Sequence, residues 1–267
     1  MTKLRLHALG TGTCLAGDPS RPAREHPLFV VEHAGGAVVF DCGEGAARRL
    51  LRAGHAVADV EHVAVTHPHA DHAALPQLLQ ARSCEALVRG ARRPLEVYLP
   101  AASAAAYPDV ARWHQPEDGG ALPRRYPVSL HGLGDGDTRA LPGATLLARR
   151  VHHGHGESPA LAYRLTAGDR VFAYSGDTGP CDGVVEVARG ADLFVCEASA
   201  RIGQDLSAYG HLSPRQAGEI ARAAGARSLL LTHYSGLDPA AAMVEDARAS
   251  GYAGWITVLT DGQIVEA

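Results

Sequence analysis

The sequence predicts an α/β fold in which two mixed β-sheets pack face to face with helices outside, an αββα sandwich. The first half of the chain is rich in short apolar strands that helices follow, and the second half repeats this order. Strands and helices in such an order form sheet layers that helices cover. A dinucleotide-binding sheet fits less well, because Gly10-Thr11-Gly12 lacks a third glycine and opens no helix.

The chain has 267 residues, a length that suits one large domain or two small ones. We predict a single domain over residues 1–267. Residues 101–127 are the least regular stretch, with many alanines, glycines and prolines. We interpret them as a variable helical insertion or cap, in which Trp113 and His114 pack or line a rim.

Composition is that of an ordinary globular protein, with 46% hydrophobic and 20% charged residues. The five cysteines are scattered and form no Cys-x-x-Cys pair, which favours a reducing cytoplasm. No apolar run approaches the roughly 20 residues of a membrane span, so no membrane association is expected.

In the first half, alternating apolar residues bounded by turn residues predict strands, with helices between them. The expected strands are 3–9, 28–32, 37–40, 60–66 and 95–99. The expected helices are 46–53 and about 75–87. Gly35-Gly36 predicts a hairpin between the second and third strands.

In the second half, Ser213-Pro214-x-Gln216 is the clearest helix start, with an N-cap serine, a proline at the first position and a capping box. A hairpin is expected between strands 255–259 and 264–266, around Asp261-Gly262. The other expected strands are 128–130, 144–151, 160–165, 170–174, 193–196 and 228–231. The other expected helices are 184–189 and 238–250.

A cluster of histidines follows strand 60–66 in the run Thr-His-Pro-His-Ala-Asp-His. His67 and His69 are two residues apart, so an extended backbone places both on one side. Asp71 and His72 follow at once and can face a second ion. Imidazole and carboxylate together are ligands of borderline metals such as zinc, so this loop is a candidate metal site.

Three later strands also end in a candidate ligand: a histidine of 152–155, Asp177 and His233. Loops at the ends of packed sheets converge, so seven ligands meet. This number is enough for two ions that share a carboxylate. Two metals about 3.5–4 Å apart can hold a bridging hydroxide and clamp both the attacking and the leaving oxygen.

These motifs resemble those of metallo-β-lactamase-fold hydrolases of the ribonuclease Z-like branch. The run from Thr66 to His72 matches that superfamily's His-x-His-x-Asp-His motif, and residues 41–45 match its Asp-Cys-Gly-Glu-Gly turn. Later matches are Ser158–Arg164, Ser175–Thr178, Cys196–Ala198, His211–Ser213 and Leu231–His233. The resemblance covers nearly the whole chain.

The resemblance implies a role for each candidate residue. One zinc ion is held by His67, His69 and a histidine of 152–155, the second by Asp71, His72 and His233, and Asp177 bridges them. Asp71 also takes the proton from the attacking water. Glu197 orients His211, which contacts the scissile phosphate or protonates the leaving oxygen.

The third histidine of the first ion needs a choice among His152, His153 and His155. Alternation along a strand prevents His152 and His153 from both facing the site. We favour His153, because the family usually shows Val-x-His-Gly at this strand end, and His155 comes next. Asp41 is expected to brace the metal loop without touching metal, and His26, His55, His62 and His131 to lie at the surface or rim.

The resemblance implies a dinuclear zinc hydrolase, most readily a phosphodiesterase. Ribonuclease Z enzymes carry a long tRNA-binding arm before the Ser-Gly-Asp-Thr motif, but here one hairpin joins Tyr163 to Ser175. The net charge is −4, so we expect a small-molecule ester or phosphodiester in preference to nucleic acid. A lactone, thioester or sulfate ester is the alternative substrate, and tRNA 3′ processing ranks lower.

Two other classes of function are weaker. A non-catalytic metal-binding protein would have lost ligands, and a di-iron oxidoreductase would show a His-x-Glu variant and a flavodoxin partner domain. Mn²⁺ or Fe²⁺ also suits these ligands, since ligand type constrains the metal only loosely. Relatives are often dimers, so a homodimer is one arrangement that the resemblance allows.

Overall fold

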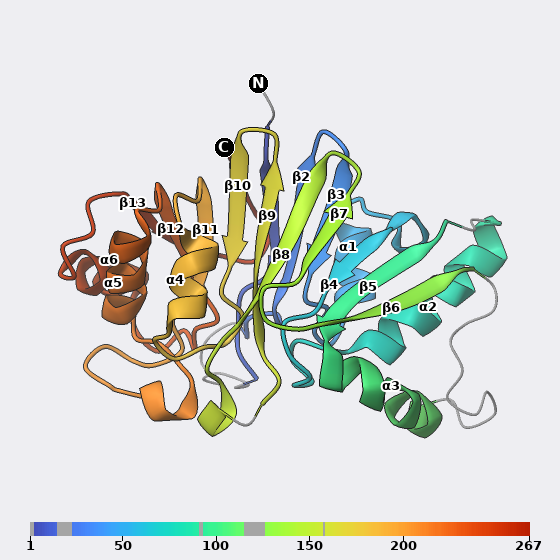
Figure 1. The fold of residues 1–267 in the computed structure, drawn as a ribbon, viewed down its shortest axis with the longest axis horizontal. Coiled ribbons are helices and arrows are strands. Elements are labelled where there is room, and N and C mark those ends of the chain that lie inside the picture. The colour runs from blue at the N-terminus through green and yellow to red at the C-terminus, as the bar shows by residue number, and fades with distance from the viewer. Residues whose placement is uncertain (1–2, 15–22, 91–92, 115–125, 157) are drawn as a thin grey trace.

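Two seven-stranded sheets lie against each other at the centre of the protein in a computed structural model (Figure 1). The structure describes all residues except 1–2, 15–22, 91–92, 115–125 and 157. The first sheet has the order β14 (Gln263–Glu266), β1 (Arg5–Gly10), β2 (Leu28–His33), β3 (Gly36–Phe40), β4 (His62–Ala64), β5 (Leu95–Pro100) and β6 (Val128–Leu133). The second has the order β13 (Trp255–Val258), β12 (Ser228–Thr232), β11 (Leu193–Glu197), β10 (Arg170–Tyr174), β9 (Leu161–Ala167), β8 (Ala144–Arg150) and β7 (Thr138–Leu141).

Both sheets are mixed. The strands from β14 to β3 are antiparallel and those from β3 to β6 are parallel. In the second sheet, β13 to β10 are parallel and β10 to β7 are antiparallel. The carboxyl ends of the parallel strands in each sheet therefore meet at one edge.

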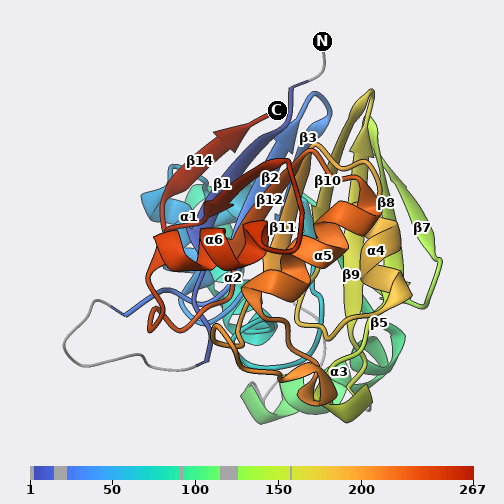
Figure 2. The same cartoon turned by 90° about the vertical axis from the view of Figure 1, so that its left-hand side faces the viewer.

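Helices cover the outer face of each sheet. Those on the first sheet are α1 (Ala46–Arg52), α2 (Leu75–Arg89) and α3 (Ala101–His114), and those on the second are α4 (Asp182–Ala188), α5 (Pro214–Ala224) and α6 (Ala240–Arg248). Figure 2 shows α4, α5 and α6 side by side in front of the second sheet. Short 3-10 turns are η1 (Val57–Asp59), η3 (Gly154–Gly156) and η4 (Ser207–Tyr209).

Three hydrophobic clusters fill the spaces between these layers. Phe29, Phe40, Tyr163 and Phe172 belong to the cluster between the sheets, where the rings of Phe40 and Phe172 lie 4.9 Å apart. The other two clusters lie under α1–α3 and under α4–α6. Helix, sheet, sheet and helix thus form four layers, and the predicted αββα sandwich is confirmed.

Local signals predicted several elements well. Ser213 caps α5: its side chain accepts a hydrogen bond from the Gln216 backbone, and the Gln216 side chain accepts one from the Ser213 backbone, so the capping box is present. The hairpins β2–β3 and β9–β10 also form as expected. The strand β7 was not predicted.

The hairpin expected at the end of the chain is wrong. Strand β13 pairs with β12 in the second sheet, whereas β14 pairs with β1 in the first, so the turn at Asp261 crosses between sheets. The Asp261 carboxylate accepts two hydrogen bonds from Thr11, one from the backbone N–H at 2.9 Å and one from the hydroxyl at 2.7 Å. This tie holds the crossing against the first sheet.

The insertion predicted at 101–127 begins as α3, and residues 115–125 of it lie outside the described part of the chain. Trp113 is 85% exposed at the end of α3, so it does not pack into a core. None of the helices that the structure describes is both long and apolar enough to cross a membrane.

Candidate metal centre

The seven predicted ligands lie together where strands of both sheets end. The 67–72 loop follows β4 of the first sheet. In the second sheet, His153 follows β8, Asp177 follows β10 and His233 follows β12. Parallel strands deliver their following loops to one edge, so residues far apart in sequence meet there.

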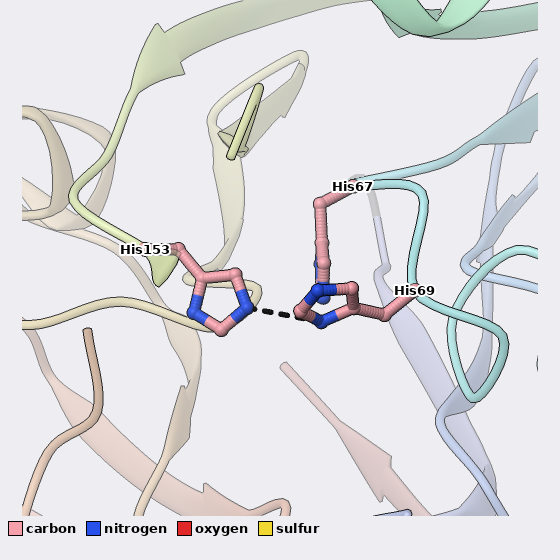
Figure 3. Close-up of side chains that lie close together, drawn as sticks. All are labelled: His67, His69 and His153. Carbon is pink, nitrogen blue, oxygen red and sulfur yellow. Dashed lines mark hydrogen bonds between the residues drawn. The ribbon is translucent and has the colours of Figure 1, made fainter. Parts of the chain in front are cut away.

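His67, His69 and His153 form the first cluster (Figure 3). His153 points from the second half of the chain toward the two histidines of the first half. Its Nε2 lies 3.1 Å from Nδ1 of His69. The three ring centroids are 4.6 to 4.9 Å apart, so all three rings border one small space.

Asp71, His72 and His233 form the second cluster, in which all three residues are buried. The Nε2 atoms of His72 and His233 lie 3.2 Å apart. Oδ2 of Asp71 is 3.4 Å from Nε2 of His233 and 3.6 Å from Nε2 of His72. These three atoms therefore face a common point.

Asp177 lies between the two clusters and faces each with a different oxygen. Its Oδ2 is 3.7 Å from Nε2 of His67 and 3.9 Å from Nε2 of His153. Its Oδ1 is 3.2 Å from Nε2 of His72 and 3.3 Å from Nδ1 of His233. This placement suits a carboxylate that bridges two ions.

The residues present fit a pair of metal ions. Nε2 of His67 and Oδ1 of Asp177 are buried and have no hydrogen-bond partner among the described residues. Zinc–nitrogen bonds of about 2.0–2.1 Å at tetrahedral angles place ligand nitrogens roughly 3.4 Å apart, close to the spacings seen. Burial lowers the pKa of His67 and of His153, so both rings are neutral and able to bind a cation.

The structure places His153 in the first cluster by way of a backbone contact. Its Nδ1 donates to the carbonyl of Gly210 at 3.1 Å, which leaves Nε2 directed at the cluster. The ring of His152 lies instead against Gly156 and Gly179. His155 has a φ of 58° and packs edge-on against Tyr209, with ring centroids 4.7 Å apart.

Asp41 supports the second cluster through hydrogen bonds. Its carboxylate lies 2.6 Å from Nδ1 of His72 and accepts bonds from the Thr66 backbone and the Tyr174 hydroxyl, each at 2.7 Å. Burial lowers the pKa of His72, but the carboxylates of Asp177 and Asp41 outweigh it and raise that pKa well above its usual range. Asp41 thus orients the ring and leaves Nε2 for the cluster.

Backbone strain occurs at the same place. Asp41 and His233 have φ values of 56° and 53°, in the left-handed region that side chains rarely adopt. Such strain costs of order 1–3 kcal/mol per residue and persists only where the surroundings hold it. Here the hydrogen bonds of Asp41, and the bond from the His233 backbone to the Thr11 carbonyl at 2.8 Å, hold both residues.

Glu197 and His211 form the second predicted pair. Oε1 of the fully buried Glu197 accepts from Nδ1 of His211 at 2.9 Å, and the ring of His211 lies 5.1 Å from that of His153. Burial lowers the pKa of His211, but Glu197 more than compensates and raises it to about 9. His211 therefore carries a positive charge at neutral pH in the metal-free protein, beside the first cluster.

Two residues of the site were missed in the sequence. The Tyr174 hydroxyl reaches Asp41 from β10, and its only local signal is that it directly precedes the Ser-Gly-Asp-Thr run. The Ser199 hydroxyl donates to Glu197 at 2.8 Å and lies 2.7 Å from Nδ1 of His233. It connects the Glu197–His211 pair to the second cluster, and its position two residues after Glu197 was the available clue.

Comparison with known proteins identifies the family. Residues 37–234 match a family model described as the β-lactamase superfamily domain. The chain is 30% identical to a ribonuclease Z of Streptomyces coelicolor, over 98% of this chain and 97% of that protein.

Solved structures share the fold. The metallo-β-lactamase fold protein YhfI from Bacillus subtilis is 19% identical and superposes with a TM-score of 0.84, covering 99% of this chain and 100% of that one. A diphosphatase from the PhnP family is 22% identical and has a TM-score of 0.73, covering 100% and 98%.

The expectation that disfavoured nucleic acid as a partner finds no support here, because proteins named ribonuclease Z are among the relatives. The expectation of a hydrolase on a metal-binding fold is supported by these comparisons. The chain belongs to the metallo-β-lactamase superfamily, in its ribonuclease Z-like branch, and is a metal-dependent hydrolase.

Proposed function

We propose that the protein is a phosphodiesterase that uses two zinc ions. His67, His69 and His153 would hold one ion, Asp71, His72 and His233 the other, and Asp177 would bind both. When bound, such ions supply Lewis-acid stabilisation of the charge on a phosphate ester. Mn²⁺ or Fe²⁺ suits the same ligands.

The observation that carries the proposal is the ion pair of Glu197 and His211 beside the first cluster. A positive imidazolium attracts an anionic phosphodiester, whereas a neutral lactone or thioester gains little from it. The side chain of His211 is 22% exposed, so a substrate can reach it, while Glu197 is buried behind it. The Glu197 carboxylate fixes the orientation of the His211 ring and favours its protonated form.

The chain's own residues then divide the proton transfers. Asp71 takes the proton from the attacking water, and its Oδ2 lies 3.6 Å from Nε2 of His72 and 3.4 Å from Nε2 of His233. His211 donates a proton to the leaving oxygen through its Nε2, because its Nδ1 is engaged by Glu197. General acid–base catalysis of this kind contributes about 10²–10⁴-fold in rate.

RNA is a second candidate substrate, because relatives over nearly the full length are named ribonuclease Z. Against it, Ala167 and Arg170 pair directly at the end of the β9–β10 hairpin, where the resemblance places a long tRNA-binding arm. A small phosphodiester therefore fits better.

The test is turnover by zinc- or manganese-loaded protein on a matched panel: bis-p-nitrophenyl phosphate, an acyl lactone, a thioester, p-nitrophenyl sulfate and a tRNA precursor with a 3′ extension. We expect bis-p-nitrophenyl phosphate to be cleaved fastest among the small esters. Cleavage of the precursor at its 3′ side would identify RNA as the substrate. Faster turnover of the lactone, thioester or sulfate ester, with the diester untouched, would overturn the proposal.

A further inference from the structure

A second group of candidate ligands lies on the outer face of the first sheet. In β1, Leu6 and Ala8 belong to the core between the sheets, whereas Leu9 belongs to the cluster under α1. Side chains alternate along a strand, so His7 points outward, on the side of the sheet that α1 covers. The candidate metal centre instead lies at the strand ends.

Glu32 of β2 and His55, which follows α1, meet His7 there. Nε2 of His7 lies 3.6 Å from Oε2 of Glu32, and Nε2 of His55 lies 3.4 Å from Nδ1 of His7. The two imidazole rings meet edge-on with centroids 5.1 Å apart. One ligand atom from each residue lies within 4.8 Å of the others. His55 is half-buried in this group.

The ring of His7 has a polar atom that needs explanation. His7 is only 7% exposed, and its Nε2 has no hydrogen-bond partner among the described residues. An unsatisfied buried polar group costs about 1–3 kcal/mol, so proteins rarely retain one without a bound partner. The unpaired nitrogen faces the Glu32 carboxylate at a distance too long for a hydrogen bond.

We propose that His7, Glu32 and His55 bind one divalent transition-metal ion, such as zinc, at a third metal site separate from the candidate metal centre. Two imidazoles and a carboxylate are a known zinc ligand set, and bonds of about 2.0–2.2 Å place ligand atoms roughly 3.3–3.5 Å apart. The 3.6 Å from His7 to Glu32 is near that spacing. All three side chains border an open hollow of about 730 Å³, from which water can complete the coordination.

Charges around the hollow leave room for a cation. Arg5 lies 3.6 Å from the same Glu32 oxygen, and Arg49 and Arg52 also border the hollow, with Glu25 and Asp261 as acidic neighbours. Arg5 has an alternative partner, because its Nε lies 3.5 Å from Glu266. A carboxylate also has two oxygens with several lone pairs, so Glu32 can serve both Arg5 and an ion.

An ion at this third site would join three segments that are separate in sequence: β1, β2 and the residue that follows α1. The expected effect is therefore on stability. Zinc would raise the unfolding temperature through this site, because a ligand that binds only the folded state stabilises it.

The test counts bound zinc by equilibrium dialysis at one buffered free-zinc concentration, followed by elemental analysis. Wild type is compared with H55Q, E32Q, the double variant and H114Q, a matched histidine change at the exposed end of α3. We expect H55Q and E32Q each to lose one zinc per chain relative to wild type, and the double variant to lose the same single ion. H114Q should match wild type, and phosphodiester turnover should be unchanged in H55Q.

Equal zinc content in wild type, H55Q and E32Q would overturn the proposal. Two ions lost in the double variant would also overturn it, since that result indicates separate sites. Circular dichroism checks that each variant is folded. If H55Q does not fold, the zinc count of E32Q still decides the test. A failure of phosphodiester turnover would leave these zinc counts interpretable, because the third site shares no ligand with the candidate metal centre.

Discussion

Nδ1 of His72 lies 2.6 Å from the carboxylate of Asp41, a residue that is fully buried and held in the left-handed backbone region. The carboxylate fixes which nitrogen of His72 carries the proton and which faces the second cluster. A candidate ligand ring is thus oriented by a carboxylate outside the candidate ligand set.

The change D41N should weaken metal binding although Asp41 is not a ligand. An amide is neutral and cannot stabilise the ring as a carboxylate does, and second-shell changes typically cost about 10–100-fold in metal affinity. Competition with a chelating dye measures the zinc dissociation constant.

D192N is the matched control. Asp192 is another buried carboxylate, but it binds the Val171 backbone, Arg170 and Arg227 away from the metal centre. It should lower stability and leave zinc affinity unchanged. Equal zinc affinity in D41N and wild type would show that Asp41 does not position His72.

Replacement of single histidines in the 152–155 stretch should separate the ligand from its neighbours. H153Q removes the ring that faces His69 and Asp177, and we expect turnover to fall at least about 100-fold, or roughly 2.7 kcal/mol of transition-state stabilisation. H152Q and H155Q should retain activity within about tenfold. Steady-state kinetics on bis-p-nitrophenyl phosphate provide the measurement, and a larger loss in H155Q than in H153Q would reverse the assignment.

The effect of H211Q should depend on the leaving group. p-Nitrophenolate departs without a proton, whereas an aliphatic alkoxide needs one, so a lost general acid affects only the second strongly. We expect kcat to fall about 10²–10⁴-fold for a diester with an aliphatic alcohol and far less for bis-p-nitrophenyl phosphate. Equal losses on both esters would assign His211 to substrate binding alone.

The titration of His211 should depend on Glu197. In metal-free protein the pKa of His211 is raised to about 9, above the ordinary 6.5, because the Glu197 carboxylate outweighs burial. The stability from this pair is therefore complete below pH 6.5 and is lost as the pH rises through about 9. In E197Q burial opposes the charge without the Glu197 carboxylate, and only the weaker effect of Asp177 still raises the pKa, so the pKa should fall clearly below 9. NMR titration of the imidazole measures this directly, and an unmoved pKa would contradict the pairing.

Metal removal should abolish activity and lower the unfolding temperature. Ions held by both clusters bind only the folded chain, because the ligands come together only on folding. A ligand at 1,000 times its dissociation constant adds about 4 kcal/mol to the free energy of unfolding. Calorimetry before and after dialysis against a chelator tests this. Zinc or manganese should restore both activity and stability, and stability that is indifferent to the chelator would argue against a bound pair of ions.

Features of the fold that depend on neighbouring residues were predictable. The capping box at Ser213 and Gln216 is local, and so is the glycine turn between β2 and β3. The candidate ligands were also predictable, because each follows an apolar strand in a recognisable run.

Features that depend on distant contacts were not predictable. The sequence of the last two strands predicts a hairpin. In the structure, Val258 packs under the helices of the second sheet, whereas Val265 belongs to the core between the sheets. That choice is made by tertiary packing, which local turn residues do not encode. The contacts of Tyr174 with Asp41 and of Ser199 with His233 likewise join separate segments.

The bridging position of Asp177 has a consequence for biogenesis. His67, His69, Asp71 and His72 come from the first half of the chain, whereas His153, Asp177 and His233 come from the second. If these seven residues hold the metal ions as proposed, neither half alone can assemble the centre, and a clipped chain should be catalytically inactive. On the proposed ligand set, hydrolysis therefore requires both halves of the chain to be folded against each other.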